Sequence, residues 1–426
     1  MRLSQEEEQM LGGKFGSAVQ RAMEMLVAVG EIYGAERMVK VTGAHLVPPD
    51  LQFWTTGELG RWSRELVEES LGDATCFRVD TTINPVIFDP NLLGAFGYPP
   101  YFVDEMDQSI AKGMALYEGR GVIPTYTCCP FFLFPPRMGE HLAMAETTVQ
   151  VFINSVYGGR TNREGGPTAL ASALTGRTPL YGAHLPENRF GQVLVELKDD
   201  LDPRKFTYAD YSALSYFVGG RTSGMTPVFK GLPRDMSTTE LLYLARSLPT
   251  TGGLLMFHAV GITPEAPTLE AAFGGRKPAD KVVVGREEIR NTFREICSAE
   301  DDKINWVLFG CPHATWEQIT SVARALAGKK IHRDVHLILA TSEPLRALAQ
   351  KTGLVDAIQI SGGHVLSNVC SVGFPRRAVP AGYRMGTAVS DSAGAAHLLK
   401  VMGVPVWFGS IEQGVKAAIT GRWEAA

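Results

Sequence analysis

The sequence has little net charge and no long apolar run. Its 426 residues carry a formal net charge of −4 at pH 7, so the charge does not favour nucleic acid or an acidic membrane surface as a partner. No apolar span reaches the length that crosses a bilayer, and the first residues, MRLSQEEEQM, lack the apolar core of a secretory signal. We therefore expect a cytoplasmic protein with no nucleic acid and no membrane among its partners.

Cysteine is too sparse for a disulfide scaffold. In a reducing compartment, the 6 cysteines of this chain are more often metal ligands or nucleophiles where they have a role. Cys128, Cys311 and Cys370 lie far apart, so no local metal motif such as CxxC joins them. Each follows a predicted strand, and proline comes soon after in TCCP and GCP, as at many iron–sulfur ligands. The alternative is burial as small apolar side chains, and spacing alone does not decide.

Helix and strand patterns predict an α/β protein. RMVKVTGAH, ATCFRVDTTINP and GVIPTYTCCP are strand-like and end in polar residues or cysteine, at the sheet edge where α/β proteins bind ligands. From residue 285, helices alternate with strands, including one expected in AIQISGG, which predicts a parallel sheet. The linker-like FGGRKPADK suggests an N-terminal α/β region, 1–275, and a C-terminal βαβ-type domain, 282–426. No internal repeat is evident.

One decapeptide, GGRTNREGGP at 158–167, concentrates charge between glycine pairs. It follows MGEHLAMAETTVQVFINSVY, interpreted as a helical run, and precedes TALASAL, which looks like the start of another helix. A glycine-rich turn before a helix favours anions, and Arg160 and Arg163 add forked donors for a carboxylate or phosphate. The alternative is a solvated loop whose arginines cap carbonyls or pair with Glu164.

The long segment from YTCCPFF to PENR resembles the large subunit of the aconitase X family. It contains GEH, AETT and RTNREGGP, and FHAVGITPEAPTLEAAFGG, GCPHAT and FGSIEQGVKAAITGR extend the match in order along nearly the whole chain. The resemblance implies an aconitase-like large subunit of several α/β units with parallel sheets. It implies a dehydratase, that is a hydro-lyase, whose swivelling domain is absent from this chain. A separate small subunit would supply that domain and its serine base, forming a heterodimer.

The resemblance also implies site residues. The family's cluster ligands match Cys128, Cys311 and Cys370 as the metal ligands of an iron–sulfur cluster, 2Fe-2S or 4Fe-4S. An open iron would act as a Lewis acid on a substrate hydroxyl. Together with the reasoning on the decapeptide and the strand ends, the expected catalytic residues are Glu146, Thr147, Arg160 and Arg163, and the expected substrate-binding residues are His45, Asn84, Pro85, Asn162 and Ser392.

Two departures from the family pattern bear on the substrate. LVPPD at 46–50 replaces a small-hydroxyl turn of the archaeal mevalonate-phosphate dehydratases, and Gly394 stands where a lysine is usual. Both changes argue against a phosphorylated substrate, so we expect a small hydroxy acid, cis-3-hydroxy-L-proline. Mevalonate 5-phosphate dehydration, a cluster-free binding protein on the same fold, and a zinc site on the same cysteines are the alternatives.

Overall fold

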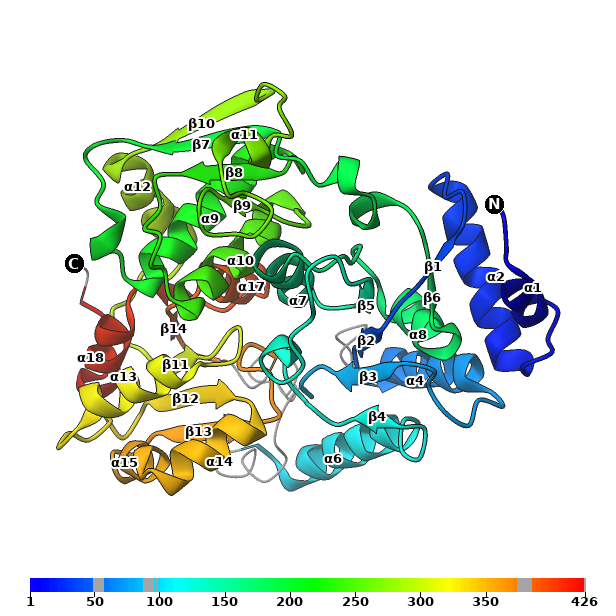
Figure 1. Ribbon diagram of the computed structural model, residues 1–426. Coiled ribbons are helices and arrows are strands. Elements are labelled where there is room, and N and C mark those ends of the chain that lie inside the picture. Colours follow the sequence, from blue (N-terminus) through cyan, green and yellow to red (C-terminus); the bar gives the residue numbers. More distant parts are fainter. Residues whose placement is uncertain (49–56, 87–95, 97, 374–384, 425–426) are drawn as a thin grey trace. The chain divides into compact units, whose positions relative to one another are not determined.

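The chain folds as two compact units, Met1–Phe190 and Gly191–Ala426, in a computed structural model that describes residues 1–48, 57–86, 96, 98–373 and 385–424 (Figure 1). Each unit is built on parallel sheets with helices in the connections, which confirms the predicted α/β class. Among the described residues, no helix is both long and apolar enough to span a membrane.

The first unit is organised around a parallel sheet of four strands, in the order β4-β3-β2-β5. Although β2 comes first along the chain, it lies between β3 and β5. The chain therefore winds outward to β4 and then returns to the opposite side of β2. The strands are β2 (Gly43–Leu46), β3 (Asp80–Ile83), β4 (Val122–Ile123) and β5 (Leu142–Met144).

Strand β5 corrects one expectation, because it occupies part of the run predicted to be helical. Residues 142–144 are buried and pair with Gly43–His45 of β2. Pairing with a buried neighbour overrides the local preference of an Ala- and Met-containing segment. The helix begins only afterwards, as α7 (Thr147–Phe152), and continues as a π-helical turn, Ile153–Tyr157. Gly158 ends that turn in the left-handed conformation, as the sequence predicted for a helix end.

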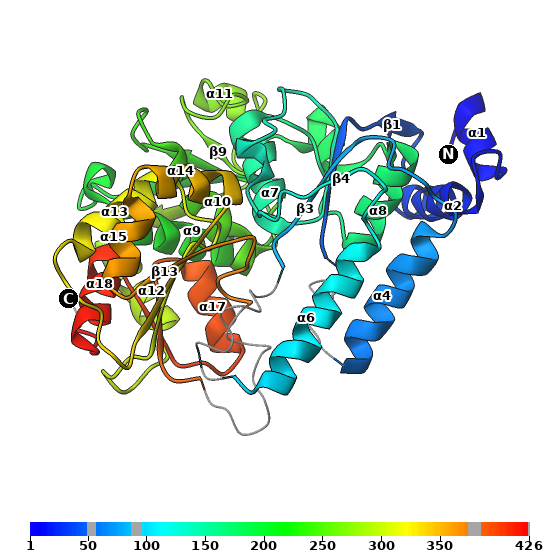
Figure 2. The same ribbon diagram turned by 90° about the horizontal axis from the view of Figure 1, so that it is seen from below.

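Helices surround the first sheet. α4 (Gly57–Leu71) and α6 (Pro100–Ala115) run side by side (Figure 2), and Arg64 Nη1 donates to Ser109 Oγ over 2.7 Å. α2 (Ser17–Ile32) packs against α8 (Gly166–Thr175). Short 3-10 turns span Pro130–Phe132, Gly182–His184 and Pro186–Asn188.

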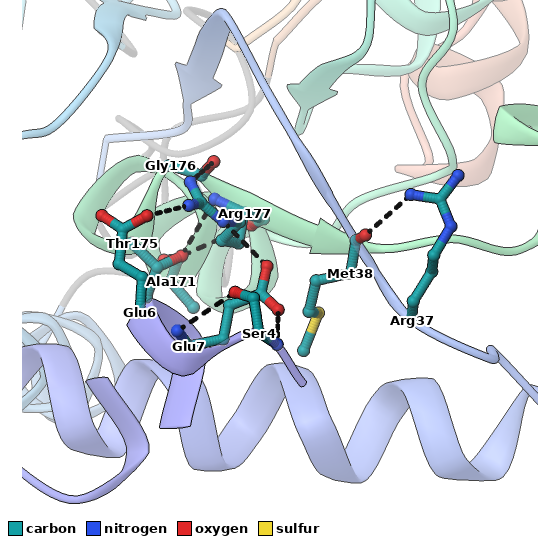
Figure 3. Close-up of polar contacts among 9 residues, drawn as sticks. All are labelled: Ser4, Glu6, Glu7, Arg37, Met38, Ala171, Thr175, Gly176 and Arg177. Atoms are coloured by element: carbon teal, nitrogen blue, oxygen red, sulfur yellow. Dashed lines mark hydrogen bonds and ion pairs between the residues drawn. The ribbon is translucent and has the colours of Figure 1, made fainter. Parts of the chain in front are cut away.

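A buried ion pair anchors the N-terminal helix α1 (Gln5–Leu11). The Arg177 side chain is only 8% exposed, and it donates to Glu7 Oε1 from Nε over 2.9 Å and to Glu6 Oε2 from Nη2 over 2.6 Å (Figure 3). Arg177 lies on β6 (Arg177–Pro179), which pairs antiparallel with β1 (Met38–Lys40). Both carboxylates therefore neutralise a charge that burial would otherwise make costly.

The second unit holds two parallel sheets. The first has the order β10-β7-β8-β9, and the second has the order β13-β12-β11-β14-β15. In both, the strand that comes first in the chain again lies between two later ones. The strands are β7 (Val193–Leu197), β8 (Pro227–Lys230), β9 (His258–Ala259), β10 (Asp280–Val284), β11 (Trp306–Phe309), β12 (His336–Thr341), β13 (His364–Ser367), β14 (Ala388–Ser390) and β15 (Val406–Phe408).

Helices connect these strands and bury the five-stranded sheet. Val307, Phe309 and Leu339 of the sheet share one core with Ile319 and Val415 of the helices. The helices are α9 (Tyr208–Thr222), α10 (Thr238–Gly252), α11 (Leu269–Ala272), α12 (Arg286–Ile296), α13 (Trp316–Leu326), α14 (Glu343–Lys351), α15 (Leu354–Ile360), α17 (Ala393–Val401) and α18 (Ile411–Thr420), with a 3-10 turn at Pro203–Lys205.

Two segments differ from expectation in the second unit. AIQISGG does not form a strand: its first four residues end helix α15, whose buried positions Val355 and Ile358 have helical spacing, and the strand is the following HVLS. The linker-like residues 273–281 lie inside this unit, because Asp280 and Lys281 already belong to β10 and pair with Val193 and Leu194.

The turn after β7 in the first of these sheets is closed by polar contacts. The Asp200 carboxylate accepts from the backbone N–H of Arg286, just after β10, over 3.2 to 3.3 Å. Lys198 pairs with Glu288 over 3.0 Å. These contacts join the ends of the two adjacent strands β7 and β10.

Candidate active site

In the first unit, expected site residues gather at the carboxyl edge of the sheet. His45 lies in β2, Asn84 follows β3, and Glu146 follows β5. β2 and β5 are the adjacent strands at which the winding changes side, and α/β sheets bind ligands at such switch points. The sheet thus brings together residues that the sequence separates by about a hundred positions.

His45 and Asn84 form a buried hydrogen-bonded chain with Thr82. His45 Nδ1 is 2.8 Å from Thr82 Oγ1, and His45 Nε2 is 3.2 Å from Asn84 Oδ1. Burial lowers the pKa of His45 to about 4, so the ring is neutral at pH 7. Because the Asn84 oxygen can only accept, Nε2 donates and Nδ1 accepts the Thr82 hydroxyl. This orientation leaves the Asn84 amide nitrogen as a donor for a ligand.

The loop that carries Cys128 is held to the same edge. Thr127 N donates to the carbonyl of Ile83 over 3.3 Å, and Ile83 N donates to Thr125 Oγ1 over 3.1 Å. Tyr126, two residues before the cysteine, has φ +41°, a left-handed value that bulky residues rarely adopt. Such backbone strain is concentrated at functional sites. The Cys128 side chain is partly exposed, whereas Cys129 is buried.

Glu146 caps helix α7. Its Oε2 accepts the backbone N–H of Val149 over 2.8 Å, so the carboxylate sits at the positive end of the helix. Thr147 is the first helical residue and is partly exposed. Pro85 directly follows Asn84 and is buried.

The arginine-rich decapeptide runs beside β5. The backbone of Arg160 forms an isolated parallel β-bridge with that of His141, and Thr161 Oγ1 accepts from Met144 N over 3.1 Å. Arg160 Nη1 donates to the His184 carbonyl over 3.3 Å, while its Nε is buried without a hydrogen-bond partner among the described residues. Arg163 is exposed, unlike the buried Glu164, whose carboxyl pKa burial raises.

The side chain of Asn162 holds a neighbouring segment of the chain through two hydrogen bonds. Its Oδ1 accepts from Ala183 N over 2.8 Å, and its Nδ2 donates to the Tyr181 carbonyl over 3.1 Å. Gly182 lies so close that a Cβ there would fall 2.3 Å from Asn162 Oδ1. Both ends of this amide hold the segment 181–183, a contact that the sequence did not predict.

In the second unit, Cys311 lies at the corresponding switch point of the five-stranded sheet. It follows β11, which pairs with β14, and Asp391 and Ser392 directly follow β14. Gly310 precedes the cysteine with φ +85°, and a Cβ there would lie 2.1 Å from the Ala340 carbonyl oxygen. Only glycine therefore fits this approach of the Cys311 loop to β12.

The loop that carries Cys370 is hydrogen-bonded to the Cys311 loop. His313 Nε2 donates to the Val369 carbonyl over 2.9 Å, and Ser371 Oγ donates to the Gly310 carbonyl over 3.0 Å. Burial lowers the pKa of His313 to about 4, which keeps this ring neutral at pH 7. The structure thus joins the loops of two predicted ligands that lie 59 residues apart in the printed sequence.

A left-handed residue precedes each of the three predicted ligands. Asn368, with φ +67°, stands two residues before Cys370, as Tyr126 stands before Cys128. Among the described residues, Tyr126, Asn368 and Ser223 are the non-glycine positions with positive φ. Two of these three lie in predicted ligand loops, which supports a function for the loops beyond chain connection.

A polar stripe on α10 lies against this edge and was not expected from the sequence. Thr239 Oγ1 is 2.8 Å from Thr315 Oγ1, and Arg246 Nε is 3.4 Å from Cys311 Sγ. Tyr243 donates its hydroxyl to Asp391, while Gln318 Nε2 donates to Tyr243 over 2.6 Å. The sequence signal for this stripe was an arginine at helical spacing from Tyr243 inside the leucine-rich LLYLARSL.

Asp391 and Ser392 are fully buried. Burial raises the pKa of the Asp391 carboxyl to about 7, and burial also raises the pKa of Tyr243 well above its ordinary value. Ser392 Oγ accepts from Ala395 N over 3.3 Å and so caps α17. The hydroxyl oxygen of Ser392, a residue that was expected to bind substrate, is therefore used to cap a helix.

The predicted ligands are chemically suited to a metal group that is held by cysteine sulfur. All 6 cysteines are free thiols, and Cys311 and Cys370 lie on mutually bonded loops. Among the described residues, no group of three or more His, Cys, Asp or Glu side chains is close enough to hold a metal ion. The same finding holds for cysteine: the second unit supplies two of the three predicted ligands, Cys311 and Cys370, and Cys128 belongs to the first unit.

Comparison with known proteins decides the family. Models of the aconitase X first, second and third domains match residues 1–187, 191–294 and 304–420. The chain belongs to the aconitase X family. It is accordingly an enzyme, a dehydratase of the aconitase X type.

Individual relatives of this aconitase X chain are similar over nearly its full length. Cis-3-hydroxy-L-proline dehydratase from Pseudomonas aeruginosa is 33% identical over 99% of the chain, which spans 70% of that relative. The phosphomevalonate dehydratase large subunit from Thermococcus kodakarensis is 32% identical over 98% of the chain and 100% of its own length. The crystal structure of Thermococcus kodakaraensis aconitase X (holo-form) superposes with a TM-score of 0.84 at 30% identity, covering 98% of this chain and 100% of that one. These findings confirm the aconitase-like fold.

Gly394, where the family pattern led us to expect a lysine, lies against another cation in this aconitase X chain. A Cβ at Gly394 would fall 2.7 Å from Nη1 of Arg246. The glycine removes the expected lysine, but Arg246 places another positive charge beside position 394. The absence of the lysine is therefore weaker evidence against a phosphorylated substrate than the sequence suggested. Of the segment LVPPD, Pro49 and Asp50 lie outside the described residues.

Proposed function

We propose that this chain is the large subunit of an iron–sulfur dehydratase that removes water from a small hydroxy acid, cis-3-hydroxy-L-proline. The observation that carries the proposal is the pair of hydrogen bonds that joins the Cys311 and Cys370 loops at the carboxyl edge of their sheet. Buried cysteines that only fill space would not need loops with left-handed residues and mutual anchoring.

Cys311 and Cys370 would be ligands of a cluster, 2Fe-2S or 4Fe-4S, and Cys128 would be the third ligand on the basis of the family resemblance. When bound, such a cluster with an open iron supplies a Lewis acid for the departing hydroxyl. The remaining chemistry falls to side chains that bind and orient the substrate.

In the first unit, His45, Asn84 and Glu146 would bind substrate. Neutral His45 fixes the Asn84 amide so that its nitrogen donates to a carboxylate or hydroxyl oxygen. Glu146, held at the start of α7, would accept from the protonated ring nitrogen of the substrate. Thr147 adds a hydroxyl beside it, and Arg163 with the Nε of Arg160 offers donors to the substrate carboxylate. Orientation of the reacting C–H and C–O bonds lowers the barrier to elimination.

The charge at this edge supports an unphosphorylated substrate. Among the described residues that directly follow the strands of the first sheet (47–48, 84–86, 124–129 and 145–147), none is Arg or Lys. His45 is neutral, and Glu146 would repel a phosphate. A zwitterionic hydroxyproline matches this combination, with Glu146 for its ring nitrogen and the donors of Asn84 and of the decapeptide arginines for its carboxylate.

A small subunit that carries the swivelling domain is the proposed partner, and the cytoplasm the proposed location. The name of the Thermococcus kodakarensis relative, a large subunit, supports such a partner. The residue that removes the substrate proton would lie on that subunit, as the family resemblance implies. The isolated chain would then bind substrate without turning it over.

The first test is the iron and acid-labile sulfide content of the chain, purified without oxygen together with the candidate small subunit. Cys311→Ser and Cys370→Ser should lose most of the iron, whereas Cys76→Ser, at an exposed cysteine, should retain it. Iron-free wild-type protein after reconstitution, or zinc in place of iron, would overturn the proposal.

The substrate is tested on the iron-loaded complex. We expect dehydration of cis-3-hydroxy-L-proline, and loss of most of this activity in Asn84→Ala and Glu146→Gln. Arg422→Gln, at an exposed ion pair with Asp302, serves as the control that keeps activity. Turnover of mevalonate 5-phosphate but not of the hydroxyproline would contradict the substrate and leave the dehydratase assignment in place.

A further inference from the structure

Arg246 is a buried cation that none of the sequence motifs includes. It lies on α10, is 9% exposed, and directs two donors at one sulfur: Nε is 3.4 Å and Nη2 is 3.5 Å from Cys311 Sγ. Guanidinium presents these N–H groups in a rigid fork, which fixes where the accepting sulfur lies. Burying a cation is costly, so its placement beside a sulfur needs a compensating role.

The other contacts of the guanidinium hold the fork in place. Nη1 donates to Thr250 Oγ1 over 3.1 Å, one turn farther along α10. On α17, a Cβ at Gly394 would lie 2.7 Å from Nη1 and 2.9 Å from Cζ. Any side chain at position 394 would push the guanidinium away from its present position. The glycine and the arginine are thus sterically matched.

The backbone around this contact is also fixed. Gly394 N donates to Ser247 Oγ over 3.2 Å, and Ala393 N donates to Ser212 Oγ over 2.8 Å. The start of α17 is therefore hydrogen-bonded to α10 and α9, two of the helices that pack against it. The Arg246 fork consequently cannot be moved aside by a shift of α17 without breaking these bonds.

We propose that Arg246 is a positioning residue for the cluster, which holds the Cys311 sulfur with two N–H···S hydrogen bonds and raises the reduction potential of the bound cluster. The proposal rests on the proposed function, because it requires a cluster at Cys311. Hydrogen bonds to a cysteine sulfur, and a positive charge beside it, stabilise the more negative reduced state. Partners of metal ligands commonly tune the metal in this way.

The test compares variants of the iron-loaded complex by redox titration, with iron and sulfide measured on the same samples. Arg246→Gln removes the charge and the fork, and its midpoint potential should fall relative to the wild type. Gly394→Ala keeps the arginine but displaces it, so its potential should shift in the same direction. Arg324→Gln, at an exposed arginine on α13, is the matched control and should leave the potential unchanged.

The outcomes separate this inference from the function on which it rests. Wild-type protein without iron would overturn both. Full iron content in Arg246→Gln with the wild-type potential would overturn only the role of Arg246. If circular dichroism shows that Arg246→Gln does not fold, Arg246→Lys, which keeps the charge but not the fork, and Gly394→Ala decide in its place. A folded Arg246→Gln chain that loses its iron would support the positioning role if Arg246→Lys, which lacks the fork, also loses iron, and would contradict it if Arg246→Lys keeps the wild-type iron content and potential.

Discussion

The Ser371 hydroxyl donates to the Gly310 carbonyl over 3.0 Å, so the loop after β13 is fixed to the loop after β11. Gly310 is itself wedged against β12, where its φ of +85° and the Ala340 carbonyl leave no room for a Cβ. The position of Cys370 therefore depends on a glycine that lies 60 residues before it in the printed sequence.

Gly310→Ala should destabilise the protein and release iron. Gly328→Ala is the matched control, because Gly328 also has a left-handed φ, +70°, but a Cβ there meets nothing within 4 Å. The control should cost about 1 kcal/mol, the price of a left-handed alanine. Gly310→Ala adds a backbone clash, so its urea midpoint and iron content should both fall further. Equal effects of the two substitutions would contradict this account of the loop.

His45 should make stability depend on pH on the acid side. Its pKa is about 4 in the folded chain and 6.5 in an unfolded one. Between these values only the unfolded chain binds the proton, so stability falls as the pH drops from about 7 to 4, by about 3 kcal/mol in all. His45→Gln removes this contribution and should flatten the dependence of the urea midpoint on pH.

The control for His45 is His332→Gln, at an exposed histidine, which should preserve the wild-type slope. His313 contributes to the slope in the same direction, because its pKa is also lowered to about 4. The two histidines lie in different units, so each single substitution should remove part of the slope and the double substitution more of it. An unchanged slope in His45→Gln would show that this ring is accessible to protons in the folded chain.

Asp391 should make stability depend on pH in the opposite direction to His45. Burial raises its carboxyl pKa from 3.8 to about 7, so between these values the folded chain holds the proton more tightly. Stability then falls as the pH rises from about 4 to 7. Asp391→Asn keeps an acceptor for the Tyr243 hydroxyl and avoids the buried charge, so it should be more stable than the wild type at pH 8, by about 4 kcal/mol, with a smaller difference at pH 5.

Urea unfolding at the two pH values measures this effect, and Asp356→Asn on the exposed side of α15 is the control. Tyr243→Phe, which removes a donor to Asp391, should lower stability at pH 8 more than at pH 5, since the carboxylate then loses the hydroxyl that binds it. Destabilisation of Asp391→Asn at both pH values alike would show that the carboxyl is charged in the folded protein.

Arg177→Met should strongly destabilise the first unit. The substitution leaves Glu7, which is 7% exposed, as a buried charge without its cation, and breaking such a pair costs about 3 to 5 kcal/mol. Adding Glu7→Gln should recover much of the loss in a urea unfolding experiment. Arg422→Met, at an exposed pair with Asp302, should have little effect. If the double variant is as unstable as Arg177→Met, the loss comes from packing of the arginine stem.

Sequence patterns predicted the α/β class and the strands that end in polar or sulfur side chains, because both follow from local features. His45, Asn84 and Cys311 were identifiable as polar or sulfur side chains at the ends of apolar runs, and the structure places them at sheet edges. The same reasoning read Leu142–Met144 as helix, because its strand character comes only from pairing with β2. Strand pairing over such distances leaves no local signal.

The polar partners of the site were not predictable for a similar reason. Arg246, Tyr243 and Gln318 look like isolated polar residues in helices, and their meaning appears only when α10 lies against Cys311 and Asp391. Asn162 illustrates the converse: its motif suggested a ligand contact, whereas both amide atoms bind the segment 181–183. Only the fold shows which polar side chain already has a partner within the chain.

The winding shared by the three parallel sheets also bears on how such a chain can be engineered. In each sheet the first strand lies between later ones, yet only two of the sheets have their strand ends occupied by the proposed ligands and binding residues. In the remaining sheet the ends of β7 and β10 are bound together by Asp200 and the backbone of Arg286. One strand order thus tolerates very different turns. A library that varies the turns after β7 and β10 would explore new binding functions while leaving the cysteine loops untouched.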